Sequence, residues 1–204
     1  MKLTKGQGAA LIVMLLLLLD QVLKIWIKTN FALHENIEVT NWFYIYFTEN
    51  PGMAFGLELI DKIYLTLFRI AAVGFIAYFL CKQVRENKSF GFIACMSLIL
   101  AGATGNILDC VFYGHFFEDS HGQIAAFLPE GGGYADFLHG KVVDMFYFPL
   151  IKSTFPTWFP IWGGEDFIFF RPIFNVADSA ICVGVFLLAI FYRETFSEAL
   201  SDKK

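Results

Sequence analysis

Carboxylate and carboxamide side chains recur at helical spacing inside otherwise apolar stretches of this 204-residue chain. Asn106 and Asp109 are three positions apart, as are Asn175 and Asp178, so each pair falls on one face of a helix. A further carboxylate, Asp144, stands in the apolar run VVDMFYFP. Two aspartates brought together can share one proton, so that one activates water while the other protonates a leaving amine. Such a pair could hydrolyse an amide bond.

A fourth segment of the chain carries an aspartate together with a lysine. Asp20 and Lys24 are four positions apart in the first apolar stretch, which predicts an intrahelical ion pair. The four histidines are scattered and lack the spacing of a zinc site, so we expect neither a metal nor another cofactor. The motifs HExxH and GxSxG are absent from the sequence, which leaves the carboxylates as the candidates for chemistry.

The composition excludes an ordinary soluble enzyme. Hydrophobic residues make up 57% of the chain and charged residues only 17%, whereas soluble domains carry about 25% charged residues. The net charge of -4 gives no reason to expect a nucleic-acid partner. The four cysteines have no CxxC spacing and lie in or beside apolar runs, so we interpret them as buried thiols. The class is an integral membrane protein.

Four apolar stretches are long enough to cross a bilayer, which takes about 20 helical residues. They cover about 8–27, 63–81, 90–113 and 173–192. We therefore expect an all-α integral membrane protein with four transmembrane helices, built as a single domain over residues 1–204.

Lysine and arginine set the expected orientation. They are frequent in the short flanks of the spans but sparse in the two long connections, about 28–62 and 114–172. Because cytoplasmic loops carry the excess of positive residues, both termini should be cytoplasmic and the long connections outside. Residues 37–47 have the composition of a short strand. Residues 114–172 are rich in glycine and aromatic residues, including Trp158 and Trp162, and we expect them to act as a lid over the site or as an interface anchor.

In this orientation the polar positions reach a common depth. A charge at mid-bilayer costs at least about 2.5–3.5 kcal/mol, which favours a functional interpretation of intramembrane carboxylates. At 1.5 Å per residue, Asp20 and both asparagine–aspartate pairs fall in the outer half of their spans, and Asp144 belongs to the outer loop. Each also has a structural explanation, as an ion pair, a helix cap or a hydrogen-bonded helix end.

Two other functions compete with an enzyme. A small proton-coupled transporter or channel would need polar residues through the inner half of the membrane. Spans two and four lack them, apart from Arg69 early in span two. A structural or assembly protein would not explain why polar pairs from separate segments meet at one depth.

Five motifs, in order and over nearly the whole chain, resemble those of the lipoprotein signal peptidases (signal peptidase II). They are DQVLK at 20–24, ENPGMAFG at 49–56, GNILD at 105–109, VVDMFYF at 142–148 and FNVADSAI at 174–181. The resemblance implies an aspartic endopeptidase of the bacterial cytoplasmic (inner) membrane, with four spans, a small extracytoplasmic β-cradle and an active site near the extracytoplasmic face. It also implies a diacylglyceryl-modified prolipoprotein as substrate, cut just before the lipidated cysteine.

The resemblance further implies roles for individual residues. Asp144 and Asp178 would be the catalytic dyad, and Asp20 and Lys24 would support the structure. The residues expected to hold the substrate or order its site are Asn50, Gly52, Asn106, Asp109, Asn175 and Arg171. Membrane lipid and an inhibitor of the globomycin type are expected partners, and we expect a monomer.

Two features depart from the family pattern. The GNILD segment is followed by Cys110, where the family motif usually ends in arginine, so a cationic substrate contact is missing there. Arg171 directly precedes the fourth span, and its position beside Asn175 and Asp178 suggests that it supplies the guanidinium instead. The outer loops are also longer than in the compact family pattern.

Overall fold

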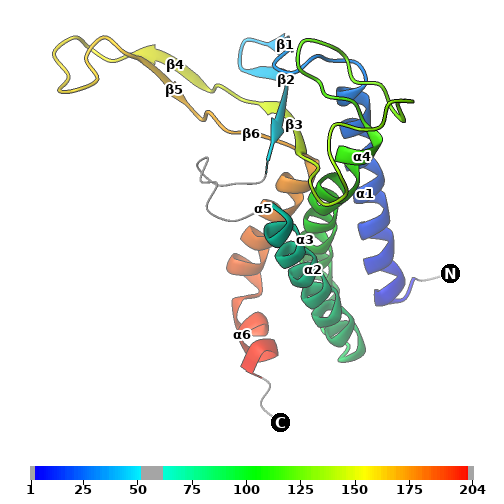
Figure 1. Cartoon of the computed structure of the whole chain (residues 1–204). Helices are drawn as coiled ribbons and strands as arrows, with labels where there is room; N and C mark the ends of the chain where they lie inside the picture. The colour runs from blue at the N-terminus through cyan, green and yellow to red at the C-terminus, as the bar shows by residue number, and fades with distance from the viewer. Residues whose placement is uncertain (1–2, 52–61, 202–204) are drawn as a thin grey trace.

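The computed structural model describes residues 3–51 and 62–201, and its helices stand side by side as a bundle with sheets at one end (Figure 1). The helices are α1 (Lys5–Lys28), α2 (Lys62–Arg85), α3 (Phe90–Leu108), the π-helical turn η2 (Asp109–Tyr113), α4 (Gly114–Phe116), α5 (Val176–Phe191) and α6 (Arg193–Ser201). Gly52 and most of the ENPGMAFG motif lie outside the described residues.

Short polar side chains start three of these helices. Thr4 and Gln7 form a capping box at the start of α1, and the Ser89 hydroxyl accepts from the Phe92 amide at the start of α3. Asn175 caps α5 in the same way, since its side chain accepts from the Asp178 amide. Each cap satisfies a backbone N–H that has no partner within the helix.

Within the described residues, three helices are long and apolar enough to cross a membrane, namely Lys5–Lys28, Lys62–Arg85 and Phe90–Phe116. Helices α5 and α6 qualify only as a pair, bent by 91° at their junction, which gives three or four candidate spans. The fourth expected span starts later than the composition indicated because Ile173 and Phe174 form a strand. The Lys5 end of α1 and helix α6 lie at the end of the bundle away from the sheets (Figure 1).

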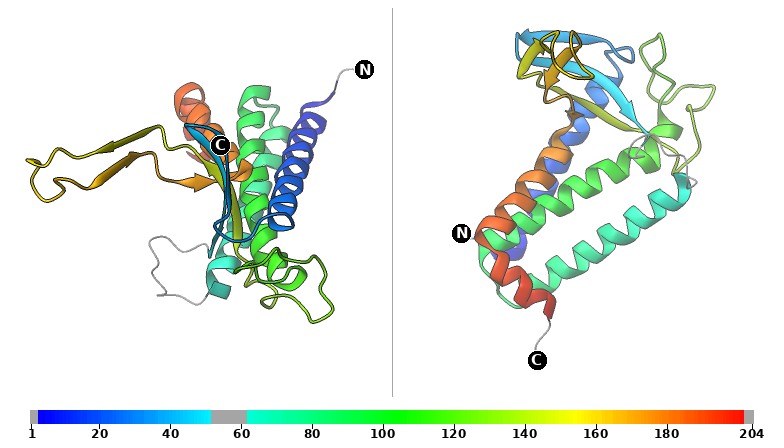
Figure 2. Two further views of the ribbon diagram at one scale, coloured as in Figure 1. Left: turned by 90° about the horizontal axis from the view of Figure 1, so that it is seen from above. Right: turned by 90° about the vertical axis from the view of Figure 1, so that its left-hand side faces the viewer.

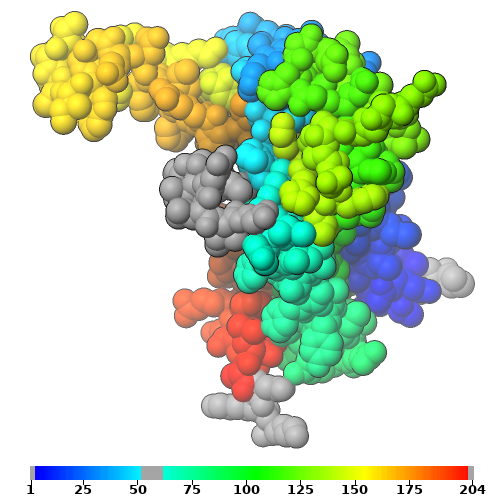
Figure 3. All heavy atoms as spheres, in the orientation of Figure 1, coloured from blue at the N-terminus to red at the C-terminus, as the bar shows by residue number. Residues whose placement is uncertain are grey.

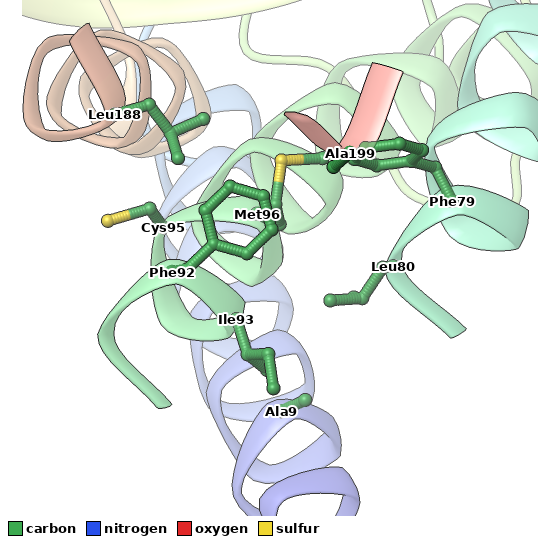
Figure 4. Packing of buried hydrophobic residues seen from close by; sticks show 9 residues of the cluster. All are labelled: Ala9, Phe79, Leu80, Phe92, Ile93, Cys95, Met96, Leu188 and Ala199. Carbon is green, nitrogen blue, oxygen red and sulfur yellow. The ribbon is translucent and has the colours of Figure 1, made fainter. Parts of the chain in front are cut away.

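Helix α3 occupies the centre of the bundle and packs closely on α5. A Cβ atom on Gly102 would lie 2.2 Å from the Ala177 carbonyl oxygen, so this helix contact requires glycine. Toward the end of the bundle away from the sheets, side chains from five helices form an apolar cluster (Figure 4). The members are Ala9, Phe79, Leu80, Phe92, Ile93, Cys95, Met96, Leu188 and Ala199.

The outward faces of the helices are apolar as well. Leu18, Phe68 and Phe186 are exposed on α1, α2 and α5, as expected for side chains that face lipid. Two of the four cysteines, Cys81 and Cys182, are also exposed, so the expectation of four buried thiols was wrong for these two.

The strands are β1 (Asn36–Thr40), β2 (Phe43–Asn50), β3 (Val142–Tyr147), β4 (Ile151–Thr154), β5 (Asp166–Phe169) and β6 (Ile173–Phe174). Four of them form an antiparallel sheet in the order β1-β2-β3-β6, and β4 pairs with β5 as a separate hairpin. The expected single strand over 37–47 is instead a hairpin that turns at Asn41 and Trp42. The description all-α therefore fits the spans but not the whole chain.

The β4–β5 hairpin extends sideways from the bundle, beyond the ends of the helices (Figures 2 and 3). The four-stranded sheet instead lies against the bundle (Figure 1). Its register places Asp144 opposite Thr48 and pairs Phe146 with Phe174. Because Phe174 directly precedes the cap of α5, this pairing brings β3 to the start of that helix.

Candidate functional site

Asn175 joins β3 to α5 at the point where β6 becomes helix. Its side-chain oxygen accepts from the Asp178 amide at 2.8 Å, and its Nδ2 donates to Asp144 Oδ1 at 2.7 Å. The side chain is fully buried. One residue therefore caps the helix that carries Asp178 and holds the carboxylate of Asp144.

Asn106, on α3, reaches the second aspartate. Its Nδ2 donates to Asp178 Oδ1 at 2.7 Å. Its Oδ1 accepts from Asn175 Nδ2 at 3.1 Å and from Lys24 Nζ at 2.9 Å. The two asparagines thus link Asp144 and Asp178 through side-chain hydrogen bonds, and Lys24 fixes the orientation of one of them.

Lys24 is a fully buried cation between two carboxylates. Its Nζ lies 2.9 Å from Asp20 Oδ2 and 2.8 Å from Asp109 Oδ2, and all three side chains have no exposed surface. The predicted ion pair between Asp20 and Lys24 is present. Its second partner, Asp109, comes from η2 and could not be inferred from spacing within α1.

The two carboxylates that bind Lys24 also reach neighbouring elements. Asp20 Oδ1 accepts from the Ala177 amide in the first turn of α5 at 2.9 Å. Asp109 Oδ2 accepts from the Val143 amide in β3 at 3.2 Å. The residues before Asp144 and Asp178 in the chain are therefore held by the same buried ion cluster.

Sequence reasoning missed Gln21 in this cluster. Its Nε2 donates to Asp109 Oδ1 at 3.0 Å and to Asp20 Oδ2 at 3.1 Å. Its Oε1 accepts from the Tyr113 hydroxyl at 3.2 Å. The available signal was its place inside the DQVLK segment, between the two residues that were singled out.

The two candidate catalytic carboxylates differ in their burial. Asp144 is only 3% exposed, whereas Asp178 is half-buried. Burial, followed by the nearby charge of Asp178, raises the pKa of Asp144 to about 8, against the opposing effects of Lys24 and the Asn175 hydrogen bond. Asp144 therefore carries a proton at neutral pH and provides the acid form that paired carboxylate chemistry needs.

Asp144 and Asp178 both line a cavity of about 300 Å³. Its other described polar lining residues are Asn50, Arg69 and Asn106. The apolar lining consists of Ala72, Val73, Ile76, Ala103, Ile107, Val142 and Ile181. A polar end with two carboxylates thus adjoins an apolar region between α2, α3 and α5.

The structure brings most of the sequence-predicted site residues together. Asn50, Asn106, Asp144 and Asp178 line the cavity, and Asn175 is buried behind them. The buried residues that hold them in place through ion pairs and hydrogen bonds are Asp20, Lys24 and Asp109.

Arg171 is the exception among the described candidates. It is exposed, donates to the Asp166 carbonyl oxygen at 3.3 Å, and is not among the described residues that line the cavity. The guanidinium at the cavity belongs to Arg69 of α2, which lies 3.6 Å from Cys110 Sγ. Its sequence signal was an ionisable residue inside an otherwise apolar span.

The inserted loop over 118–136 contributes none of the described cavity-lining residues. It packs instead against the Lys28 end of α1, where Ser120 is buried. The Ser120 hydroxyl accepts from Lys28 Nζ at 2.9 Å, and its carbonyl oxygen accepts from the Leu33 amide at 2.9 Å. A lid role for this loop stays a prediction.

Comparison with known proteins gives consistent matches over most of the chain. A family model described as signal peptidase (SPase) II matches residues 12–193. A lipoprotein signal peptidase of Porphyromonas gingivalis (strain ATCC 33277) is 53% identical over 204 residues, covering 100% of this chain and 90% of the relative. One of Amoebophilus asiaticus (strain 5a2) is 35% identical, with 97% and 81% covered.

The fold also has a solved counterpart. A bacterial membrane enzyme structure determined by the in meso method at 1.9 Å resolution has a TM-score of 0.59 and 24% identity, over 90% of each chain. A second such structure, at 2.3 Å resolution, has the same TM-score at 22% identity and covers 97% of this chain and 92% of the other. At this identity the likeness concerns the fold alone.

Replacement of the buried cation tests the ion cluster. Lys24→Met leaves Asp20 and Asp109 buried without a counter-charge, and we expect the free energy of unfolding to fall by about 3–5 kcal/mol. Thermal or denaturant unfolding of the detergent-solubilised protein measures this loss. The matched control is Lys82→Met, because Lys82 and Glu86 form a partly exposed pair at 3.9 Å. Removing that pair should cost at most about 1 kcal/mol. Equal, small effects of both variants would contradict the assignment.

Proposed function

Because the chain belongs to the signal peptidase II family and is a peptidase, we propose that Asp144 and Asp178 are the catalytic pair of an aspartic endopeptidase. The protein is a multi-pass membrane protein of a family that removes signal peptides from prolipoproteins. The observation that carries the proposal is one cavity lined by two aspartates, which Asn106 and Asn175 link by hydrogen bonds.

The pair can hydrolyse an amide while conserving one proton. The ionised carboxylate accepts a proton from water as the water oxygen adds to the scissile carbonyl carbon, and the other carboxyl protonates the carbonyl oxygen. Collapse of the tetrahedral intermediate breaks the C–N bond. The leaving nitrogen takes a proton from one carboxyl, and the other carboxylate recovers a proton from the intermediate. The pair ends as it began, with one proton between two carboxylates.

The proposed substrate is a diacylglyceryl-modified prolipoprotein, cut before its lipidated cysteine. Asn50, Asn106 and Asp178 stand at the polar part of the cavity, next to an apolar lining from α2, α3 and α5 that suits lipid or signal-peptide side chains. The motifs add Gly52 to the proposed substrate site, while the buried Asp109 and Asn175 would order that site, and a globomycin-type inhibitor would compete for it. We place this site near the extracytoplasmic face of the bacterial inner membrane, in a monomer with both termini cytoplasmic.

Cleavage of a diacylglyceryl-modified prolipoprotein by the purified protein tests the proposal. Asp144→Asn and Asp178→Asn should each lower turnover at least about a thousandfold, since catalytic groups that act as a unit fail together. A gel-shift assay separates precursor from product. Asp136→Asn, at an exposed aspartate, is the matched control and should cleave like wild type.

The possible outcomes distinguish the alternatives. Near-normal turnover of either site variant, with an unchanged unfolding temperature, would move the catalytic assignment to Asp109. If wild type fails on a competent substrate, the peptidase proposal fails and the transporter alternative returns.

The shared proton also predicts a pH dependence. Asp144 has a raised pKa of about 8 and is protonated below that pH. As the pH rises through about 8, the pair loses its proton and can no longer act as an acid, so kcat/KM, which reports the free enzyme, should fall by up to tenfold per pH unit. Initial cleavage rates at substrate concentrations below KM between pH 6 and 10, each followed by a return to pH 7, measure this limb. A rate that stays constant to pH 10 would contradict the assigned proton.

A further inference from the structure

Arg69 places a guanidinium at the candidate active site from a helix that none of the five motifs includes. Its Nη1 is 3.6 Å from the Sγ of Cys110, and its side chain lines the same cavity as Asp144 and Asp178. Cys110 is buried in η2, directly after Asp109. The cation of α2 therefore lies beside the position at which the motif would otherwise carry an arginine.

We infer that Arg69 binds a backbone carbonyl of the substrate next to the scissile bond, in place of the arginine missing at position 110. This inference rests on the proposed peptidase function. A guanidinium offers five N–H donors in a fixed plane and stays charged at every pH of interest, which suits carbonyl oxygens in an apolar cavity. Ala72 and Val73, from the next turn of α2, provide that apolar surrounding. Arg171 is exposed and bound to the Asp166 carbonyl oxygen, outside this cavity.

Kinetics of four single variants test this role. Arg69→Ala should lower kcat/KM on the order of 10- to 100-fold, the range for a hydrogen bond to a charged group, with the larger part of the change in KM. Arg69→Lys should lower kcat/KM less than Arg69→Ala does, because lysine keeps the charge but not the planar donors. Arg85→Ala, at the exposed end of the same helix, and Arg171→Ala should both cleave like wild type.

A swap of the two positions sharpens the test. Arg69→Ala combined with Cys110→Arg should recover most of the lost kcat/KM, because the guanidinium returns to the same part of the cavity. Wild-type kinetics of Arg69→Ala, or a loss confined to Arg171→Ala, would overturn the inference while leaving the peptidase proposal intact. Failure of wild type to cleave would overturn both.

A separate observation concerns the β4–β5 hairpin, which is amphipathic across its two faces. Directly opposed residues share a face of a two-stranded sheet. The pairs Ile151–Phe169 and Ser153–Phe167 make one face mainly apolar, while the pairs Lys152–Ile168 and Thr154–Asp166 make the other mainly polar. Alternation also places Phe155 on the apolar side.

The apolar face continues into an aromatic tip. The Phe155 ring lies 5.1 Å from that of Phe159 and 5.2 Å from that of Phe167, measured between centroids. Beyond them, Trp158 is 78% exposed and Ile161 is 87% exposed. A two-stranded hairpin alone is at best marginally stable in water, so a second surface must cover these side chains.

The polar face has a partner within the protein. Lys152 Nζ donates to the Tyr44 hydroxyl of β2 at 3.0 Å and lies over its ring. Ile151 and Phe169, on the opposite face, stay 54% and 51% exposed. The hairpin thus turns its polar side to the four-stranded sheet and its apolar side away from it.

We propose that the apolar face and tip of this hairpin rest in the outer lipid interface beside the bundle. The strand that follows the hairpin, β6, leads directly into α5, whose exposed Val183 and Phe186 face lipid, so the hairpin is attached to the start of a candidate membrane span and extends sideways from it (Figure 2). Tryptophan and phenylalanine at the tip match the composition of interfacial anchors. The four charged residues of 150–171 cancel, two basic and two acidic, so anionic lipid is not required.

Depth-dependent quenching in nanodiscs of zwitterionic phosphatidylcholine tests this anchor. In a variant that keeps Trp158 and replaces Trp26, Trp42 and Trp162 by Phe, lipid with a spin label near the headgroup should quench the emission at low and high salt. Aqueous iodide should quench it weakly. The matched control replaces Trp158 by Phe as well and adds Thr154→Trp on the polar face, where iodide should quench and labelled lipid should not.

Three results would overturn the anchor. The first is quenching of Trp158 by iodide but not by labelled lipid. The second is protection of Trp158 from both quenchers, which indicates a protein contact such as a second copy. The third is equal quenching by labelled lipid of Trp158 and of the tryptophan introduced by Thr154→Trp. Ile161→Trp in the background without other tryptophans gives an independent probe of the same tip, so a misfolded first variant does not decide the result.

Discussion

The geometry of the candidate site depends on one buried ammonium group, that of Lys24. Burying an ion costs several kcal/mol, and only close opposite charges and hydrogen bonds offset this cost. Lys24 has these partners in Asp20, Asp109 and Asn106, each 2.8–2.9 Å away. Because Asp20 and Asn106 in turn bind residues of α5, and Asp109 binds β3, the need to neutralise one cation fixes β3 and α5 relative to the helices that carry the cluster. Ion pairing here supplies positional specificity more than stability.

The two aspartates acquire different chemistry from different surroundings. Asp144 lies on a strand with its carboxyl buried against Asn175, and its raised pKa keeps it protonated at neutral pH. Asp178 lies in the first turn of α5, half-buried and held by Asn106. Two neighbouring like charges cannot both ionise cheaply, so in the proposed mechanism the pair holds a single proton. In this account the acid and the base arise from one residue type placed in two environments.

Local spacing predicted two contacts of the candidate site, and the roles of Asp144 and Asp178 came from the family resemblance, whereas contacts between distant elements followed from neither. The pair of Asp20 and Lys24, and the cap formed by Asn175, depend only on residues within a turn or two. Sequence alone favoured Arg171 as the cavity cation because it is near Asn175 in the chain. The proximity of Arg69 and Cys110 depends instead on how α2 packs on η2. The turn within 37–47 was missed for a similar reason, since both arms of that hairpin have strand composition.

Infrared difference spectroscopy with carboxyl-labelled aspartate measures directly whether Asp144 and Asp178 share one proton. We expect one protonated carboxyl band at pH 7 that disappears as the pH is raised through about 8, and that is missing from Asp144→Asn over the same pH range. If wild type shows no carboxyl that titrates in this range, or if the same band persists in Asp144→Asn, the two aspartates do not share a proton as described.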